Sequence, residues 1–261
     1  MSRLIRCSER DVQTLARLRA VVPAESSKEQ LISYRDKVVV KPWGYEFLMF
    51  ENDQVAVWFL HIEKGHATSM HCHPRKKTAL LVLQGQVLCN TFYNRNYLSA
   101  PEAIVIDAGV FHSTQSLSPS GADLIEVETP PDKTDLVRLN DQYGRQGRGY
   151  EGLAEMKTEN LERFGYFHFS GAKAEVFQGR SFDIGLTPFS QGTQFGGRVQ
   201  PERTSLYCAC RGRLIDEQGQ TVLDVGDAAD GLFFQVFDRV MAETDCLVLS
   251  CSSKAAKGES R

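Results

Sequence analysis

The sequence has no long apolar run and no large surplus of charge, and these two absences exclude several classes of protein. No stretch of the 261 residues approaches the ~18 uninterrupted apolar residues of a membrane helix, and the opening MSRLIRCSERD is charged where a signal peptide would be apolar. Thirty Lys and Arg against thirty-three Asp and Glu leave a net charge of -3, so bulk charge favours neither nucleic acid nor an anionic membrane as partner. We therefore expect a cytoplasmic protein with a small-molecule partner.

The cysteines also lack the patterns that would assign them a role. The seven cysteines are an odd number and include no CxxC pair, so the sequence indicates neither a disulfide framework nor a thiol-only zinc site. We expect buried, reduced thiols. Cys72 has the most suggestive position, because it lies between His71 and His73.

What the sequence does contain is a β-rich pattern that follows a short helical segment. Ser8 is typical of a helix N-cap, and the apolar residues after it fall on one helical face until Pro23. From Val38 the chain changes to short and alternating apolar runs such as VAVWFLHI, ALLVLQG and DLIEVET, separated by Gly, Asn, Asp and Pro turns. Short strands without intervening amphipathic helices predict an all-β fold that protects its strand edges as a barrel or a sandwich.

The pattern of strands repeats in the second half of the chain. Residues 138–160 are charged and Gly-rich and are typical of a connector, after which the strands resume. RGRLIDEQGQTVLDVGDAA in the second half is similar to QGQVLCNTFYNRN and AIVIDAG in the first, which favours two tandem β domains. We predict a helical arm over 1–36, a first domain over 37–150, a second domain over 151–254 and a flexible tail over 255–261.

The histidines are concentrated in the first predicted domain. His71 and His73 lie two residues apart in a segment that we expect to be extended, so both imidazoles leave the same face of the strand. His112 follows the turn DAGVF, where Gly109 permits a close approach of the backbone. Three imidazoles that meet would hold a divalent transition metal and leave coordination positions open, as in a catalytic site. The alternative is that these histidines are ordinary packed or surface residues.

The residues around the first two histidines have the spacing of a known motif. Gly65, His71, His73 and Gly85 follow the pattern Gly, five residues, His, one residue, His and a later Gly, and Thr78 stands where that motif has Glu. This pattern resembles the first motif of the cupin superfamily. The resemblance implies a double-stranded β-helix (jelly-roll) barrel in each half, a bicupin, with a metal site in the first barrel.

A second motif of the same superfamily places Pro, one residue, Gly and two residues before a His. Gly109 and His112 match it, with Asp107 in place of the proline and Ser116 in place of the usual Asn. The two motifs together imply that His71, His73 and His112 bind a divalent transition metal, whether Zn, Fe, Mn or Ni.

Two further segments narrow the resemblance. KPWGYEF at 41–47 and DLVRLNDQYGR at 135–145 are similar to the opening and closing segments of the cupin domain of type II phosphomannose isomerases. In that family Gln, His, Glu and a distant His bind the metal. The corresponding positions here are His71, His73, Thr78 and His112. The resemblance covers the first domain and implies an isomerase of carbohydrate metabolism.

Charged residues near the motifs are candidates for the chemistry beside the metal. Glu126 and Glu128 share one strand face, so either is a candidate for the missing carboxylate ligand or for a proton-transfer base. Arg75, Lys76 and Lys77 follow the histidine pair, and they either grip a phosphate or carboxylate or form a solvated hairpin turn.

Two arginines near the end of the first domain have two readings as well. The isomerase resemblance implies that Arg138 and Arg145 face the mouth of the barrel, and the alternative is a structural ion pair with Asp135 or Asp141.

The second domain lacks the metal motif, since its one histidine is His168. We expect a degenerate barrel that braces the first domain or forms a subunit contact, for instance in a homodimer. Phe233, Phe234 and Phe237 form an apolar cluster that suits either the core or such an interface.

Three functions follow from these observations. The leading hypothesis is a metal-dependent isomerase or epimerase of an anionic sugar derivative, phosphorylated or nucleotide-linked, with Glu126 or Glu128 moving the proton and Arg75 and Lys77 holding the anionic group. The alternatives are a three-histidine dioxygenase that uses ferrous iron and a sugar-binding cupin without catalysis.

Overall fold

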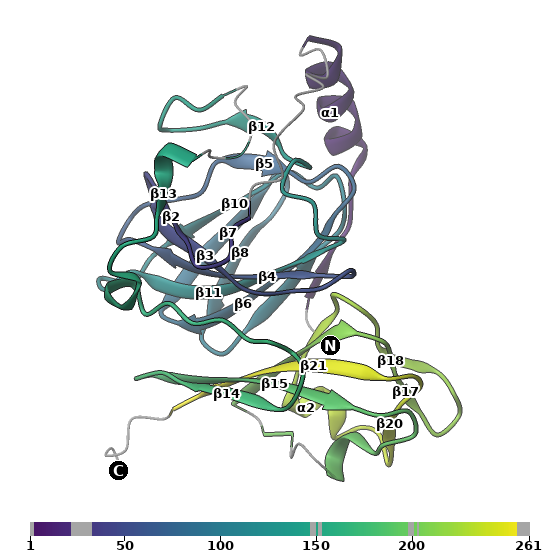
Figure 1. Cartoon of the computed structure of the whole chain (residues 1–261). Coiled ribbons are helices and arrows are strands. Elements are labelled where there is room, and N and C mark those ends of the chain that lie inside the picture. Colours follow the sequence, from purple (N-terminus) through teal and green to yellow (C-terminus); the bar gives the residue numbers. More distant parts are fainter. Residues whose placement is uncertain are drawn as a thin grey trace, which may run out of the picture.

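Strands dominate the structure, as the alternating apolar pattern predicts. The computed structural model describes residues 3–21, 33–146, 150, 153–197, 201–202 and 204–254. Within these residues the chain forms four sheets, arranged as two consecutive two-sheet units behind a short N-terminal helix (Figure 1). The predicted all-β class, with two β units in tandem behind a short helical segment, is confirmed. In the same described residues no helix is long and apolar enough to cross a membrane.

The first unit consists of sheet A and sheet B. Sheet A has the spatial order β1 (Arg3–Ile5), β9 (Ala103–Ile106), β6 (Lys77–Gln84), β11 (Ala122–Thr129), β4 (Ala56–Ile62), β3 (Gly44–Glu51), β2 (Val38–Lys41) and β13 (Met156–Lys157). Sheet B has the order β12 (Val137–Asn140), β5 (Met70–Cys72), β10 (His112–Ser116), β7 (Gln86–Thr91) and β8 (Arg95–Ser99).

The second unit consists of sheet C and the smaller sheet D. Sheet C has the order β14 (Glu175–Gln178), β15 (Phe182–Phe189), β21 (Cys246–Ser253), β16 (Ser205–Arg211) and β19 (Ala228–Asp230). Sheet D has the order β18 (Thr221–Leu223), β17 (Leu214–Asp216) and β20 (Val240–Ala242). The helices are α1 (Glu9–Val21), α2 (Gly231–Phe234) and the short 3-10 segments Leu153–Glu155, Leu161–Phe164 and Phe195–Gly197.

The N-terminal segment is bound more closely to the first unit than an arm would be. Helix α1 begins after Ser8, whose backbone N–H donates to Asp11 Oδ2 at 2.9 Å, so the predicted cap is confirmed. Strand β1 precedes the helix and pairs in parallel with β9, an element that the sequence analysis missed. Pro23, the predicted end of the helix, lies outside the described residues.

Part of the predicted connector is strand. β12 pairs with β5, and β13 pairs with β2, so the connector interpretation of 138–160 is wrong at residues 138–140 and at Met156–Lys157. Their local composition is polar, and both become strands because a distant strand of the first unit offers unpaired backbone groups. The first unit therefore uses residues on both sides of its predicted boundary.

Sheet A is covered on both faces, which explains its nearly continuous apolar runs. Successive side chains of β11 alternate: Leu124 belongs to the apolar cluster inside the barrel, whereas Ile125 and Val127 belong to the cluster on the opposite face. By the same alternation Glu126 and Glu128 point into the barrel with Leu124. The alternation thus decides which charged side chains reach the interior.

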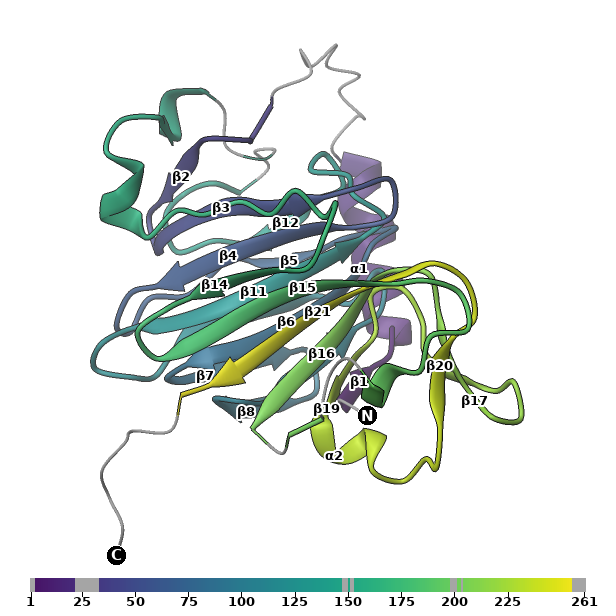
Figure 2. The same cartoon turned by 60° about the horizontal axis from the view of Figure 1, so that its bottom comes forward.

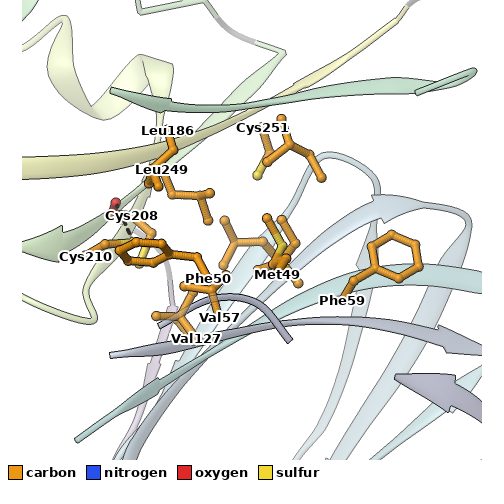
Figure 3. Packing of buried hydrophobic residues seen from close by; sticks show 14 of the residues in the cluster. Met49, Phe50, Val57, Phe59, Val127, Leu186, Cys208, Cys210, Leu249 and Cys251 are labelled. Atoms are coloured by element: carbon orange, nitrogen blue, oxygen red, sulfur yellow. Dashed lines mark hydrogen bonds between the residues drawn. The ribbon is translucent and has the colours of Figure 1, made fainter. Parts of the chain in front are cut away.

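The outer face of sheet A packs on sheet C of the second unit, and the ribbons of the two sheets lie one upon the other (Figure 2). Met49, Phe50 and Val57 contribute from the first unit, and Leu186 and Leu249 contribute from the second (Figure 3). The second unit therefore braces the first, through one shared apolar core. The three phenylalanines of the predicted aromatic cluster differ in burial. Phe234 is buried in the core of the second unit, whereas Phe233 and Phe237 are partly buried and pack against that core.

We expect the shared core to be essential for stability. Leu249 is fully buried in it, and Leu249→Ala should lower the free energy of unfolding by about 2–5 kcal/mol, because the deletion removes apolar contacts and leaves a cavity. Denaturant unfolding measures the change. Val176→Ala at an exposed position is the control and should stay within about 0.5 kcal/mol of the parent. Equal, small effects of both substitutions would contradict a shared core.

An ion pair also links β4 and β11 near one end of sheet A. His61 Nδ1 lies 2.6 Å from Asp123 Oδ1, and the two residues are direct cross-strand partners. The hydrogen bond to Asp123 raises the pKa of His61, although burial opposes the shift. The folded state therefore binds the His61 proton more tightly than the unfolded state does.

The stabilisation by this pair should depend on pH. Because the folded-state pKa of His61 is raised, its contribution is complete below the unfolded pKa of about 6.5 and is lost as the pH rises through the folded value. His61→Gln should thus lower the free energy of unfolding by about 1 kcal/mol at pH values near 5.5, and by less near pH 9. A difference of equal size at both pH values would argue against the protonated pair.

Candidate metal centre and its pocket

Three histidines of the first unit converge inside the barrel. His71 in β5 lies directly opposite His112 in β10, and His73 follows the end of β5. The ring centroids of His71 and His112 are 4.5 Å apart, those of His71 and His73 are 5.0 Å apart, and those of His73 and His112 are 5.7 Å apart. One ring nitrogen from each lies within 4.8 Å of the others, an arrangement that can hold a metal ion.

The Nδ1 atom of each ring is held by a backbone carbonyl. Its partners are Ser69 O at 2.8 Å from His71, Asp135 O at 2.7 Å from His73 and Val110 O at 3.0 Å from His112. A carbonyl oxygen only accepts, so Nδ1 donates its proton and the lone pair of the neutral ring lies on Nε2. Backbone partners of this kind orient the histidine ligands of metal sites.

The electrostatic setting keeps these imidazoles neutral. Burial lowers the pKa of all three, and the pKa values of His71 and His73 fall well below the ordinary value. Three neutral, pre-oriented imidazoles fit the ligand preference of Zn, Fe or Ni. The donor set therefore suits the divalent transition metal that the motifs imply.

The turn before His112 is held from two sides. Gly109 has φ +82°, and its N–H donates to His73 O at 2.8 Å, so the predicted tight backbone approach at this glycine is present. The N–H of Phe111 donates to Asp11 Oδ1 at 2.8 Å, and Asp11 belongs to α1. The N-terminal helix thus positions His112, a role that the sequence analysis did not find.

Asp135 has a similar supporting role for His73. Besides its carbonyl bond to His73, its carboxylate accepts the backbone N–H of Arg75 at 2.8 Å and of Lys76 at 3.1 Å. It also pairs with the Arg75 side chain, so the ion pair foreseen for Asp135 forms with a different arginine.

The histidines line a pocket of about 660 Å³, counted with its opening to solvent. Its charged lining comprises Lys41, Glu46, Lys76, Glu126, Glu128, Lys133, Arg138 and Arg145. Among the residues that the structure describes, five of these side chains are basic and three are acidic.

Both predicted carboxylates are in this pocket. Within sheet A, Glu126 is the cross-strand neighbour of Trp58 in β4, and Glu128 is the cross-strand neighbour of Thr78 in β6. Both have a carboxylate oxygen within 4.8 Å of a His73 nitrogen, yet no such group among the described residues joins either carboxylate to His71 or His112. The carboxylates are thus beside the histidine trio rather than part of it.

The two carboxylates have opposite electrostatic character. Burial, reinforced by the charge of Glu128, raises the pKa of Glu126 to about 7. Burial acts in the same direction on Glu128, but Lys133 and Lys76 outweigh it and lower the pKa of Glu128. Lys76 Nζ lies 2.7 Å from Glu128 Oε1. Glu128 therefore keeps its negative charge to a lower pH than a free carboxylate does, whereas Glu126 keeps its proton to a higher pH.

The basic run after His73 does not act as a unit, and the expectation for Arg75 and Lys77 is corrected. Lys76 lines the pocket, whereas Arg75 and Lys77 do not. Arg75 is mostly exposed and pairs with Asp132 and Asp135. Lys77 Nζ lies 2.8 Å from Asp227 Oδ1 and so links the two units.

Both predictions for Arg138 and Arg145 apply, because the two side chains face the pocket and Arg145 also forms an ion pair with Asp141. Arg138 and Arg145 line the pocket, and Arg138 lies next to His71 in the register of β12 and β5. Arg145 also forms a two-point ion pair with Asp141, at 3.1 and 2.7 Å. This pair holds the position of the Arg145 guanidinium.

Local backbone geometry explains the KPWG segment at residues 41–44. It forms the turn between β2 and β3, where Gly44 has φ +143° and a Cβ atom would lie 2.0 Å from His61 O. The turn brings Lys41 and Glu46 into the pocket, and the sequence analysis did not single out either residue as functional. A lone Glu in the apolar run YEFLMF was the available signal for Glu46.

The cysteines take no part in the site. All seven are free thiols, and six of them are buried, as expected. Burial raises the pKa of Cys72 to about 12, and its side chain does not line the pocket. The second unit contributes no residue to either candidate metal group found in the described part of the chain, which agrees with its lack of a motif.

Comparisons with known proteins find solved structures of low similarity to this chain. No family model and no curated protein matches the chain. KdgF from Halomonas sp. is 18% identical over 36% of this chain and 84% of its own, with a TM-score of 0.34. An RmlC-like cupin from Shewanella frigidimarina is 18% identical over 40% and 95%, with a TM-score of 0.33. A putative sugar phosphate isomerase from Acidithiobacillus ferrooxidans is 16% identical over 30% and 52%, with a TM-score of 0.28.

We expect the histidine trio to hold about one metal ion per chain. His73→Ala should reduce the bound metal to less than about a tenth, because it removes one of three ligands. Elemental analysis of the purified protein measures both the content and the identity of the metal. His66→Ala, outside the pocket, is the control and should keep the full content. Equal metal content in the parent and the His73 variant would exclude this site.

Proposed function

We propose that this protein is a metal-dependent isomerase or epimerase of a sugar derivative that carries an anionic group, phosphorylated or nucleotide-linked. The observation that carries the proposal is the position of Glu126 and Glu128 next to His73 in one buried pocket. A carbonyl compound held at the histidines would then have a proton acceptor at its side. This arrangement supports a reaction in which polarisation and proton transfer take place in one cavity.

His71, His73 and His112 would hold the metal. A divalent ion bound there would polarise a carbonyl or an adjacent hydroxyl of the substrate. The three ligands are neutral, so they leave the charge of such an ion uncompensated. The ligand set therefore supports binding of an electron-rich substrate oxygen.

Glu126 is the residue that we assign to proton transfer. In an isomerisation, its carboxylate would take a proton from the carbon next to the carbonyl and return it to the former carbonyl carbon. The proton of the hydroxyl group on the first carbon would pass to the former carbonyl oxygen. The pKa near 7 supports this assignment, because a base of that strength is both available and able to give the proton back. Glu128, held by Lys76, stays ionised and maintains that pKa.

The charge of the lining supports an anionic substrate. Lys41, Lys76, Lys133, Arg138 and Arg145 all line the pocket. Ammonium and guanidinium groups bind the oxygens of an anionic group on a sugar by charge and by hydrogen bonds.

Glu126→Gln should lower kcat by about 10²- to 10⁴-fold while the metal content stays unchanged, because the amide cannot accept the proton. The assay is turnover of a panel of sugar phosphates and nucleotide sugars by the metal-loaded protein. Glu63→Gln, an exposed carboxylate outside the pocket, is the control. The proposal fails if no member of the panel is isomerised or epimerised, and Glu126 loses its role if the amide variant keeps full activity.

A dioxygenase is the second candidate, and the neutral three-histidine set favours it. Ferrous iron held by imidazoles alone would keep a positive charge suited to an anionic chelating substrate. Iron content and oxygen uptake separate this function from the first. Full occupancy by zinc or manganese, with no oxygen consumption on thiols or diketones, would exclude it.

A further inference from the structure

One wall of the pocket carries charged groups whose mutual contacts are too long for good hydrogen bonds. Lys41 Nζ lies 3.4 Å from Glu46 Oε1, and Lys133 Nζ lies 3.5 Å from the same oxygen and 3.6 Å from Glu128 Oε1. Lys76, by contrast, lies 2.7 Å from Glu128, the distance of a charge-assisted hydrogen bond. Ammonium and carboxylate groups therefore alternate along this wall, and three of their contacts are longer than a good hydrogen bond.

Polar atoms without partners occur along the same wall. Glu46 Oε1, Glu128 Oε2 and the hydroxyl of Tyr150 are buried and have no hydrogen-bond partner within the described residues. Glu46 is 4% exposed and Glu128 is 1% exposed, so the protein itself must satisfy these oxygens or a bound molecule must. Since buried polar atoms in native proteins are nearly always paired, the unpaired atoms indicate hydrogen bonds to a ligand or to water.

Aromatic rings hold the two ammonium groups in place. Lys133 Nζ lies 3.5 Å from the centroid of the Trp58 ring and 4.5 Å from that of Tyr150, and Lys41 Nζ lies 3.8 Å from the Tyr150 centroid. Contacts of this kind stabilise a cation over the face of a ring. The rings therefore help to fix both lysines on this wall.

We propose that Glu46, Lys133 and Glu128 bind adjacent hydroxyl groups of the sugar. A hydroxyl donates one hydrogen bond and accepts others, so it can lie beside an ion pair, donate to the carboxylate and accept from the ammonium group. A phosphate or carboxylate group is an anion, so Glu46 and Glu128 would repel it. The inference rests on the proposed function in treating this pocket as the substrate site, and it narrows the substrate to one with a vicinal diol.

The anionic group of the substrate then lies away from this wall. Lys133 is the central residue of the recognition, because it faces both carboxylates. Lys133 is a specificity-determining residue, because it binds the hydroxyl groups of the substrate and takes no part in the proton transfer.

Calorimetric titration of the full-length, metal-loaded protein tests the wall with two probes, D-mannitol and inorganic phosphate. D-mannitol has vicinal hydroxyls and no carbonyl, so it can bind without being turned over. We expect saturable binding of D-mannitol, weakened at least about tenfold by Glu46→Gln and by Lys133→Met, because each removes a charged partner of a hydroxyl. Glu63→Gln is the matched control and should bind as the parent does.

Phosphate should respond in the opposite direction in the Glu46 variant. Loss of the Glu46 charge should strengthen phosphate binding, whereas it weakens mannitol binding, and a merely structural role of Glu46 would weaken both. If Glu46→Gln does not fold, the Lys133→Met titration decides. Phosphate binding without mannitol binding in the parent, or mannitol binding unchanged in both variants, would overturn the inference.

The outcomes also separate this inference from the proposed function. Mannitol binding that depends on Glu46 and Lys133, with no isomerisation of any sugar in the panel, would refute only the isomerase. Isomerisation with an unchanged KM in the Glu46 and Lys133 variants would refute only the hydroxyl-binding wall.

Discussion

Sheet A is buried on both faces, and the site depends on this arrangement. Side chains along each of its strands alternate between the barrel interior and the core shared with sheet C. A charged residue on the interior face is therefore fixed by a strand that cannot shift by one residue, since such a shift would move its apolar neighbours out of two cores at once. Glu46, Glu126 and Glu128 owe their positions to this constraint.

The orientation of the three histidines depends instead on hydrogen bonds to backbone groups. Each ring gives its Nδ1 proton to a main-chain carbonyl, so the turns of the chain determine where the three lone pairs point. Asp11 and Asp135 hold those turns through backbone N–H groups. The result is a set of three neutral imidazoles that lies next to a wall of charged side chains.

Much of this site follows from local spacing, and the rest depends on contacts between distant segments. The positions of His71 and His73 on one strand face, and of Glu126 and Glu128 on another, follow from a period of two residues. The same period excludes Lys77 from the pocket, although charge alone made it a candidate beside Lys76. Strands β1, β12 and β13 were not foreseen, because their short, polar segments become strands only when a partner strand is already in place.

The amino-acid sequence alone determined the all-β class, the tandem arrangement and the identity of the three histidines, because these depend on residue type and on spacing along a strand. Tertiary structure decided which charges meet. Lys133 reaches Glu46 and Glu128, and Asp11 reaches the turn of His112, across separations along the chain that no local pattern encodes. Side-chain periodicity specifies a face, whereas the neighbour of that face depends on how the sheets are stacked, since burial of apolar surface selects the stacking.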